Sequence, residues 1–536
     1  MALGRGSLPT RGAGPMVDQP GGFDLLRLPG LRRLLGWRYA RFAFQLPLLI
    51  VAAVVIADGL TGQQMAARNA ATTGVWIHYR GLVVLALAFF GNAFCAACPL
   101  MLTRGLTRWL QRRLPRTLAW PRIVRNKVFV LVLTLAVLWA YEAFGLWASP
   151  WLTAWLAVGY FVAALAVDAL FPAGTFCRYV CPLGNFNFVL SSVSPTQIAA
   201  LDPDVCRACD DKPCLHGRSA APAAARPATG APTRGPAGVT TRGTYSGTYS
   251  AAVGAGVGAA VGGVDAVAGR AVLPGCESDL MVPTITSNMD CTYCFNCVRA
   301  CPYDNVALRL REPGRELAKD PWRHRAGATT LLFGVLLAVW GVMNALAMIG
   351  PFQAIADVAG RVLGTHDHGV LVLVLYGVAS VLGLALTVAF ALLADLVGGA
   401  PPRPWRAFRR WGYVAVALGF GFWTAHYLFH FLTGGAGAVP VLEQILARFG
   451  ADLAPNWGLD RLVPVPWLFP VQAVVTALYA ALAMATAVRI GVRDFGRRGV
   501  LAMWPMALFA LLFAAVQILV LAQPMQMRGT MMMGGG

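Results

Sequence analysis

Apolar stretches long enough to cross a lipid bilayer recur along this chain, and short polar segments separate them. A hydrocarbon core about 30 Å thick is crossed by about 20 helical residues. By this measure the pattern predicts nine membrane-spanning helices, four in an N-terminal membrane domain (42–172) and five in a C-terminal one (327–523). The predicted spans are 42–58, 77–97, 127–147, 150–171, 328–350, 369–397, 411–434, 466–488 and 500–523.

The composition agrees with this pattern. Hydrophobic residues make up 57% of the 536 residues, charged residues make up 13%, and the mean hydropathy is +0.60. Soluble domains carry about 25% charged residues, so we expect a mainly α-helical, polytopic membrane protein. No small-residue cleavage site closes the first apolar stretch, so it is predicted to stay as a transmembrane helix rather than to be removed as a signal peptide.

The net charge of +20 comes from arginines that gather in the polar segments. With nine spans these segments all fall on one side, which the positive-inside rule assigns to the cytoplasm. They are residues 27–41, 104–127, 403–410 and 489–498. We therefore expect the cytoplasmic (inner) membrane, with the N-terminal segment (1–41) inside and a Met-rich tail (524–536) outside. Because topology explains the charge, nucleic acid is not expected as a partner.

A hydrophilic region (173–326) lies between the fourth and fifth predicted spans and is expected to form a cytoplasmic α+β domain. Within it, residues 217–272 are rich in Ala, Gly, Pro, Ser and Thr and include the doubled sequence GTYSGTYS. Such a segment buries too little apolar surface to offset its chain entropy. It is therefore predicted to be a disordered insertion.

All twelve cysteines lie in this region or at helix ends that face it. Cytosolic thiols stay reduced, so this spacing favours metal ligation over disulfides. Residues 289–304, MDCTYCFNCVRACPYD, contain the C-x2-C-x2-C-x3-C-P run of bacterial ferredoxins, which binds [4Fe–4S] clusters. The cysteines of this run are Cys291, Cys294, Cys297 and Cys301.

A second, less regular cysteine run precedes the insertion, and a single cysteine follows it. In two-cluster ferredoxins the fourth cysteine of a run ligates the other cluster. This crossover pattern predicts one cluster held by Cys206, Cys209, Cys214 and Cys301, and another held by Cys291, Cys294, Cys297 and Cys276. The alternative is a single cluster, with the less regular run binding zinc or no metal.

The other four cysteines form an internal pair of motifs, FCAACPL (94–100) and FCRYVCPL (176–183). Each motif follows an even-numbered span, so the two should meet at the same depth on the cytoplasmic side. A proline after each second cysteine ends the helix and frees backbone groups near the site. These residues predict a third metal or redox site made by Cys95, Cys98, Cys177 and Cys181.

Together these features resemble membrane-bound polyferredoxins of the NosR/NapH/CcoG type, which are 4Fe–4S ferredoxin-type integral membrane proteins. The resemblance covers roughly residues 40–310. Cys177-x3-Cys181-Pro182 matches the family motif, whereas Cys95-x2-Cys98-Pro99 is one residue shorter. The resemblance implies electron transfer at the membrane with redox partner proteins, in support of a copper or molybdenum enzyme outside the cytoplasm. It does not explain spans five to nine.

Histidines and methionines mark the expected outer side. His426 and His430 lie one helical turn apart in the seventh span, and His366 and His368 precede the sixth. The tail carries Met525, Met527, Met531, Met532 and Met533. Imidazole and thioether groups suit copper, and imidazole also suits a b-type haem. The alternatives are histidines that hydrogen-bond between helices and a tail without a ligand role.

Three carboxylates, Glu142, Asp168 and Asp395, lie within or at the ends of apolar spans. Each could relay protons or contact a quinone, or it could pair with a loop arginine. We find no phosphate-binding loop, nucleophile elbow or dinucleotide fingerprint, so an electron-transfer component is favoured over a stand-alone enzyme. The alternative function is a copper-handling, cupric-reducing assembly factor, and a third is a scaffold whose clusters only hold the fold together.

Overall fold

The computed structural model describes residues 21–37, 39–113, 118–172, 174–219, 272–322 and 327–525. In this part of the chain the protein is mainly helical, and eight helices are long and apolar enough to cross a membrane. They are α2 (Ala40–Thr61), the continuous α3, η3 and α4 (Ala70–Phe90), α8 (Pro150–Leu170), α13 (Gly327–Leu346), α15 (His368–Val397), α17 (Tyr413–Gly434), α19 (Leu468–Phe495) and α21 (Trp504–Leu521). The chain is thus a multi-pass membrane protein.

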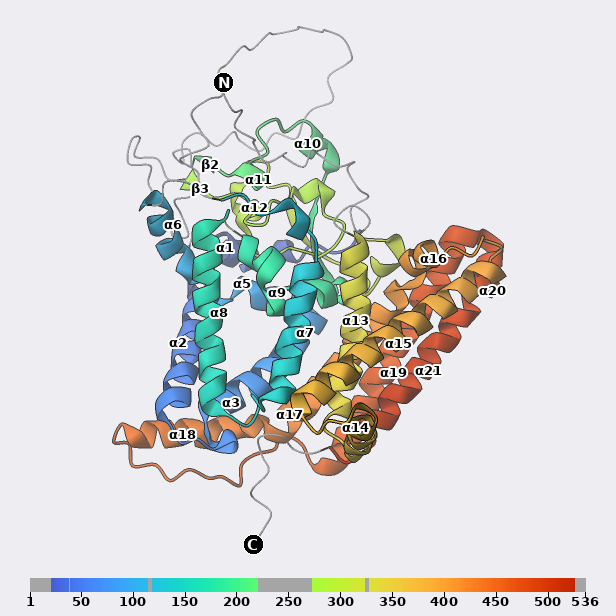
Figure 1. Ribbon diagram of the computed structural model, residues 1–536. Coiled ribbons are helices and arrows are strands. Elements are labelled where there is room, and N and C mark those ends of the chain that lie inside the picture. The colour runs from blue at the N-terminus through green and yellow to red at the C-terminus, as the bar shows by residue number, and fades with distance from the viewer. Residues whose placement is uncertain are drawn as a thin grey trace, which may run out of the picture.

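The ninth predicted span corresponds to α7 (Val128–Ala143), which has 16 residues. At 1.5 Å per residue it is about 24 Å long, which is shorter than a typical bilayer core. The basic helices α6 (Arg104–Arg113) and α16 (Pro404–Trp411) and the short α20 (Gly499–Ala502) lie at the same end of the long helices as the cysteine-rich segment (Figure 1). The structure therefore gathers the basic segments at one end, as the nine-span pattern predicts.

Helix α17 is the centre of the C-terminal membrane domain. In an 18-residue apolar window of this helix 83% of the residues are buried, and the helix packs against α13 and α19. A Cβ atom added at Gly419 would lie 2.6 Å from Cβ of Ala338, and one added at Gly421 would lie 2.4 Å from Cβ of Tyr479. Because small residues let helix backbones approach closely in membranes, these glycines explain the tight packing.

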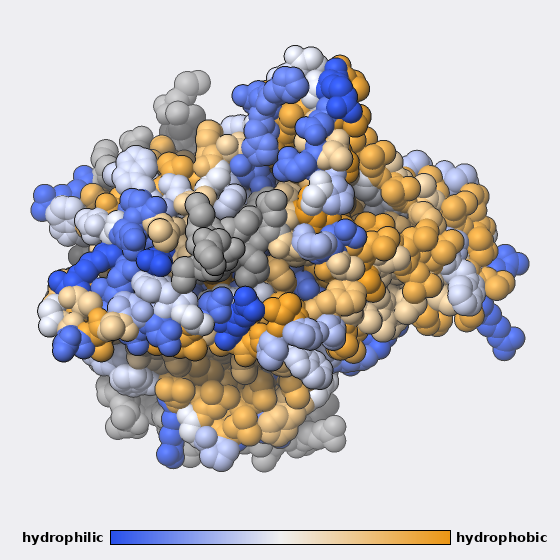
Figure 2. Space-filling view, turned by 90° about the horizontal axis from the view of Figure 1, so that it is seen from below, coloured by the Kyte–Doolittle hydropathy of each residue, from blue (hydrophilic) through white to orange (hydrophobic). Residues whose placement is uncertain are grey.

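Two amphipathic helices, α14 (Gly350–Leu363) and α18 (Ala438–Arg448), lie at the other end of the bundle and were not predicted (Figure 1). Figure 2 views this end and shows hydrophilic residues over its left and central part, with hydrophobic residues toward the right and the lower part. Arg448 forms an ion pair of 2.7 Å with buried Asp58, which joins α18 to α2.

The cysteine-rich segment contains two small antiparallel sheets. Strand β1 (Thr196–Ala200) pairs with β4 (Val306–Leu310), and β2 (Arg218–Ser219) pairs with β3 (Val272–Leu273). The second sheet corrects the predicted insertion 217–272, because residues 218, 219 and 272 belong to these strands. The rest of the insertion, residues 220–271, lies outside the described residues.

The N-terminal segment is part of the same unit rather than a separate element. Leu26 in η1 (Leu25–Arg27) and Leu35 in α1 (Leu31–Gly36) are buried with apolar residues of the cysteine-rich core. Asp24 accepts hydrogen bonds from the backbone N–H groups of Leu26 (3.0 Å) and Leu308 (3.1 Å). This packing was not predicted, because the apolar residues of the segment are too few to form a membrane span and are interrupted by Gly, Pro and Arg.

Two of the three predicted intramembrane carboxylates pair with arginines. Asp168 forms an ion pair of 3.4 Å with Arg104, and Asp395 forms one of 2.5 Å with Arg410. Asp395 also accepts a 2.8 Å hydrogen bond from the indole N–H of Trp411. For these two residues the structure confirms the alternative that each carboxylate pairs with an arginine. Glu142 is buried at the end of α7.

We predict that Gly419→Ala destabilises the protein and that Gly377→Ala in α15 does not. The added methyl group at Gly419 must push α13 and α17 apart, and overpacking of this kind costs about 1–3 kcal/mol. A Cβ atom at Gly377 meets nothing within 4 Å. Thermal unfolding in detergent should show a lower Tm for the first variant alone. Equal Tm values would contradict the close approach of the two helices.

Candidate functional site

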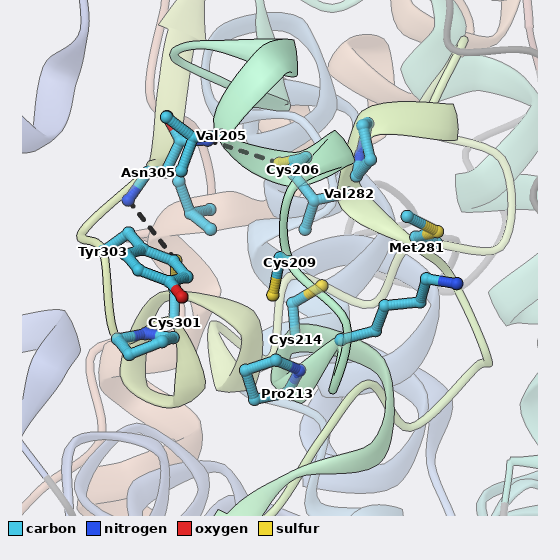
Figure 3. Close-up of a pocket in the computed structure, with 14 residues that line it drawn as sticks. Val205, Cys206, Cys209, Pro213, Cys214, Met281, Val282, Cys301, Tyr303 and Asn305 are labelled. Carbon is cyan, nitrogen blue, oxygen red and sulfur yellow. Dashed lines mark hydrogen bonds between the residues drawn. The ribbon is translucent and has the colours of Figure 1, made fainter. Parts of the chain in front are cut away.

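The first pocket of the cysteine-rich segment brings together one of the two predicted ligand sets. It encloses about 370 Å³ of empty space, part of it open to solvent. Its walls include all four cysteines of the set (Figure 3), namely Cys206, Cys209, Cys214 and Cys301. Three of them come from α10 (Pro203–Arg207), α11 (Pro213–His216) and the loop between them, whereas the fourth follows α12 (Asn296–Ala300).

The second pocket brings together the other predicted set. It encloses about 340 Å³, and its walls include Cys276, Cys291, Cys294 and Cys297. Each pocket thus combines three cysteines of one run with a single cysteine from the other half of the segment. This is the grouping that the crossover pattern predicts, and cluster binding itself stays a prediction.

No group of three or more His, Cys, Asp or Glu side chains in the described residues lies close enough together to hold a single metal ion. In a [4Fe–4S] cube each cysteine binds a different iron, so the four sulfur atoms surround a volume rather than a point.

Several N–H groups point at the cysteine sulfur atoms. The side-chain amide of Asn305 donates to Sγ of Cys206 (3.3 Å), and its backbone N–H donates to Sγ of Cys301 (3.4 Å), as Figure 3 shows. In the second pocket the backbone N–H of Leu280 donates to Sγ of Cys276 (3.2 Å). Hydrogen bonds to sulfur stabilise thiolate charge and tune the reduction potential of a bound cluster.

Burial raises the pKa of Cys206 to about 11, although the hydrogen bond from Asn305 acts in the opposite direction and lowers it. Burial likewise raises the pKa of Cys276 to about 12, and the charge of Cys294 adds to this effect. Without metal these thiols are therefore protonated at neutral pH. Because metals bind the thiolate, cluster insertion must displace these protons and becomes less favourable as the pH falls.

The backbone around the pockets is unusual. Among the described non-glycine residues, seven have positive φ angles, and six of these lie within three residues of a cysteine. They are Lys212, Asp279, Asp290, Tyr293, Phe295 and Asp304. Such conformations cost about 1–3 kcal/mol each and concentrate at functional sites. Here they turn the short loops so that successive cysteines can face one pocket.

The four-cysteine set, Cys95, Cys98, Cys177 and Cys181, does not sit where the predicted spans placed it. The predicted span 77–97 is wrong at its end, because α4 ends at Phe90 and Gly91 follows with φ +67°. Its first two cysteines therefore belong to a separate short stretch, α5 (Ala93–Ala96) and the start of η4 (Pro99–Thr103).

The two motifs of this set nevertheless meet. Sγ of Cys177, in η6 (Phe176–Val180), lies 3.3 Å from Sδ of Met101 in η4. From α9 (Pro182–Leu190), Asn187 donates to Sγ of Cys95 (3.5 Å). Burial raises the pKa of Cys177 well above its usual value, Arg104 opposes this, and the negative charge of Cys98 adds to it. The four thiols therefore share one buried environment with a thioether that sequence reasoning missed.

His426 and His430 are buried in α17, with ring centroids 4.9 Å apart. Two imidazoles on one helix face cannot take the opposite axial positions of one haem, so this pair would supply one haem ligand at most. Met525 packs against an apolar cluster that includes Phe422 and Ala425 of α17. His366 and His368 are exposed at the start of α15. The predicted methionines Met527, Met531, Met532 and Met533 lie outside the described residues.

Arg80 is a buried residue that sequence reasoning missed. Its guanidinium group lies over the rings of Trp76 (4.6 Å), Tyr141 (4.4 Å) and Tyr427 (5.0 Å), and it donates to the Tyr141 hydroxyl (3.1 Å). It follows a π-helical stretch, η3 (Thr73–Tyr79), which is common at functional sites. The signal was a charged residue inside an apolar span.

Comparison with family models, curated proteins and solved structures found no match for this chain.

We predict that Asn305→Ala weakens cluster retention in the first pocket, whereas Tyr303→Phe does not. The first change removes the hydrogen bond from the Asn305 amide to Sγ of Cys206. A hydrogen bond worth about 1 kcal/mol changes an equilibrium constant roughly fivefold. Tyr303 lines the same pocket but is 59% exposed. Iron release to a chelator should be faster for the first variant alone, and equal rates would exclude a role for this amide.

Proposed function

We propose that this chain is a membrane-bound iron–sulfur electron-transfer protein with two [4Fe–4S] clusters. It would pass electrons between a cytoplasmic or quinol donor and a respiratory or metalloenzyme-maturation partner. One observation carries this proposal, namely the two pockets that each gather four cysteines in the crossed grouping of a two-cluster ferredoxin. The proposed location is the inner membrane, with the cysteine-rich segment in the cytoplasm.

The protein's own residues suit this task. When bound, a [4Fe–4S] cluster takes up and releases single electrons. Asn305 and Leu280 supply N–H groups that offset negative charge on the sulfur atoms. Buried Tyr293 and Val298 exclude water from the interior of the segment. The strained loops and short helices hold the thiols in place, so little reorganisation accompanies a change of charge.

The four-cysteine set would hold a third centre. Its thiols converge from two motifs and receive N–H groups, including that of Gly184, which donates to Sγ of Cys181 (3.2 Å). The paired motifs followed by a cysteine-rich segment also support the proposed relation to polyferredoxins of the NosR/NapH/CcoG type. Spans five to nine would then be an addition to that plan.

A second candidate function is copper handling by a cupric-reducing assembly factor. The observation that favours it is the thioether of Met101, 3.3 Å from the thiol of Cys177. Thioether and thiolate ligands together select Cu(I) over harder metal ions. The buried His426 and His430 would provide imidazole groups, and Met525 would provide a thioether.

The iron content of the anaerobically purified protein in detergent tests the first function. We expect about eight irons and eight sulfides per chain, with two interacting clusters in the EPR spectrum of the reduced protein. Cys209→Ser and Cys294→Ser should each remove one cluster and leave the other. Four or fewer irons in a fully loaded sample would contradict the two-cluster function.

Copper retention tests the second function. If copper handling is correct, protein loaded with Cu(I) should keep about one copper per chain after desalting, because thiolates and thioethers bind it tightly. Met101→Leu should release copper more readily, and Met65→Leu, which changes an exposed methionine, should not. Iron content should be unchanged in both variants. Equal copper retention in the two would argue against a copper role for the four-cysteine set.

A further inference from the structure

The second pocket and the four-cysteine set lie against each other. Asn92, just before α5, donates its side-chain amide to the carbonyl oxygens of Cys291 (2.8 Å) and Asn288 (3.1 Å). Ala96, between Cys95 and Cys98, packs against the apolar core of the cysteine-rich segment. Among the hydrogen bonds and ion pairs of the described residues, none joins the first pocket to the four-cysteine set.

A buried ion-pair network spans the junction between the second pocket and the four-cysteine set on one side. Glu277 directly follows a cysteine of the second pocket, and it pairs with Arg41 of α2 and with Arg104 of α6 (2.6 Å). Arg104 also pairs with Asp168 at the end of α8.

A second network spans the junction on the other side. Asp290 directly precedes Cys291, and it pairs with Lys127 (2.8 Å) and with Arg178 (3.4 Å). Arg178 lies inside the second motif of the four-cysteine set, between Cys177 and Cys181. Lys127 also donates to the carbonyl oxygen of Arg178 (2.7 Å). Glu277 and Asp290 thus pair with cations from α2, α6, η6 and the residue before α7.

The same cations also face the four-cysteine set. Lys127 donates to Oδ1 of Asn185 (2.7 Å), and the side-chain amide of Asn185 donates to the carbonyl oxygens of Cys177 (3.1 Å) and Cys181 (2.9 Å). Asp168, which pairs with Arg104, accepts a hydrogen bond of 3.2 Å from the backbone N–H of Phe176, the residue before Cys177. A charge buried at this junction is screened little by salt, so it acts on both sites at once.

We propose that the two networks, Glu277 with Arg41 and Arg104, and Asp290 with Lys127 and Arg178, are positioning residues that couple the second pocket to the four-cysteine set. They fix the spacing between the two sites and set their reduction potentials together. This inference rests on the proposed electron-transfer function. It makes the second pocket the inner site of a one-electron exchange, in which a soluble one-electron carrier protein is oxidised as this chain is reduced and no covalent bond changes.

The test is an EPR-monitored redox titration of the full-length protein in detergent, with dithionite as reductant. Cys209→Ser and Cys294→Ser identify the signals of the first and second pockets. Reduction adds negative charge, so loss of a nearby cation should disfavour the reduced form. Arg104→Gln should lower the equilibrium constant for reduction of the second-pocket cluster about tenfold. This corresponds to a reduction potential about 59 mV lower for a one-electron couple. Any centre at the four-cysteine set should shift in the same direction.

Three further variants sharpen the test. Arg104→Lys keeps the charge and should restore most of the shift, whereas Glu277→Gln should raise the potential instead. The matched control is Asp204→Asn, which changes an acid two residues before Cys206 whose side chain is 71% exposed. Solvent screens that charge, so the control should change the equilibrium constant for reduction of either cluster by about twofold at most. If Arg104→Gln cannot be purified with metal, the rise in Glu277→Gln decides.

The outcomes separate this inference from the function on which it rests. A wild-type protein without iron would overturn the proposed function and the inference together. Eight irons with potentials that do not respond to Arg104→Gln or Glu277→Gln would overturn the inference alone. A shift in the first-pocket cluster as large as that in the second would also overturn it, because the networks would then not be specific to the inner pocket.

Discussion

The pairing of buried charges at the junction between the membrane helices and the cysteine-rich segment is the interaction on which the rest of the structure depends. An unpaired charge there would cost several kcal/mol, because water is excluded. Glu277 and Asp290 are each met by two cations, and Asp168 is met by Arg104. Removing one partner leaves the other buried without compensation, so these pairs specify one arrangement of the two parts. The second pocket and the four-cysteine set take their positions relative to each other from that arrangement.

The two halves of the membrane region are built differently. In the N-terminal half the long helices end before the cysteine motifs, and short helices such as α5 and η6 contain cysteines next to the cysteine-rich segment. The C-terminal half is packed around α17, where glycines permit close helix contacts and aromatic side chains fill the remaining space. Only the first half touches the second pocket through the ion pairs described above. The second half contributes tightly packed helices and the buried histidines.

Aromatic packing connects these halves in space. Asn187 contacts Cys95 of the four-cysteine set, and the ring of its neighbour Phe186 lies 5.3 Å from Trp423 and 6.3 Å from Tyr427 of α17. Tyr427 in turn lies beside His426, with ring centroids 5.9 Å apart, and over the guanidinium of Arg80. Arg80 and His426 are thus connected with Cys95 through packed side chains.

The sequence by itself determined the membrane class, the helix positions to within a few residues for most spans, and the crossed grouping of eight cysteines. These follow from local rules, namely apolar length and motif spacing, which need no tertiary contact. The tertiary structure alone decided the break after Phe90, the packing of residues 24–36 on the cysteine-rich core, and the nearness of Met101 to Cys177. It also decided that Asp168 and Asp395 pair with arginines. Each of these depends on which distant segments meet, and charge pairing between them has no period in the sequence.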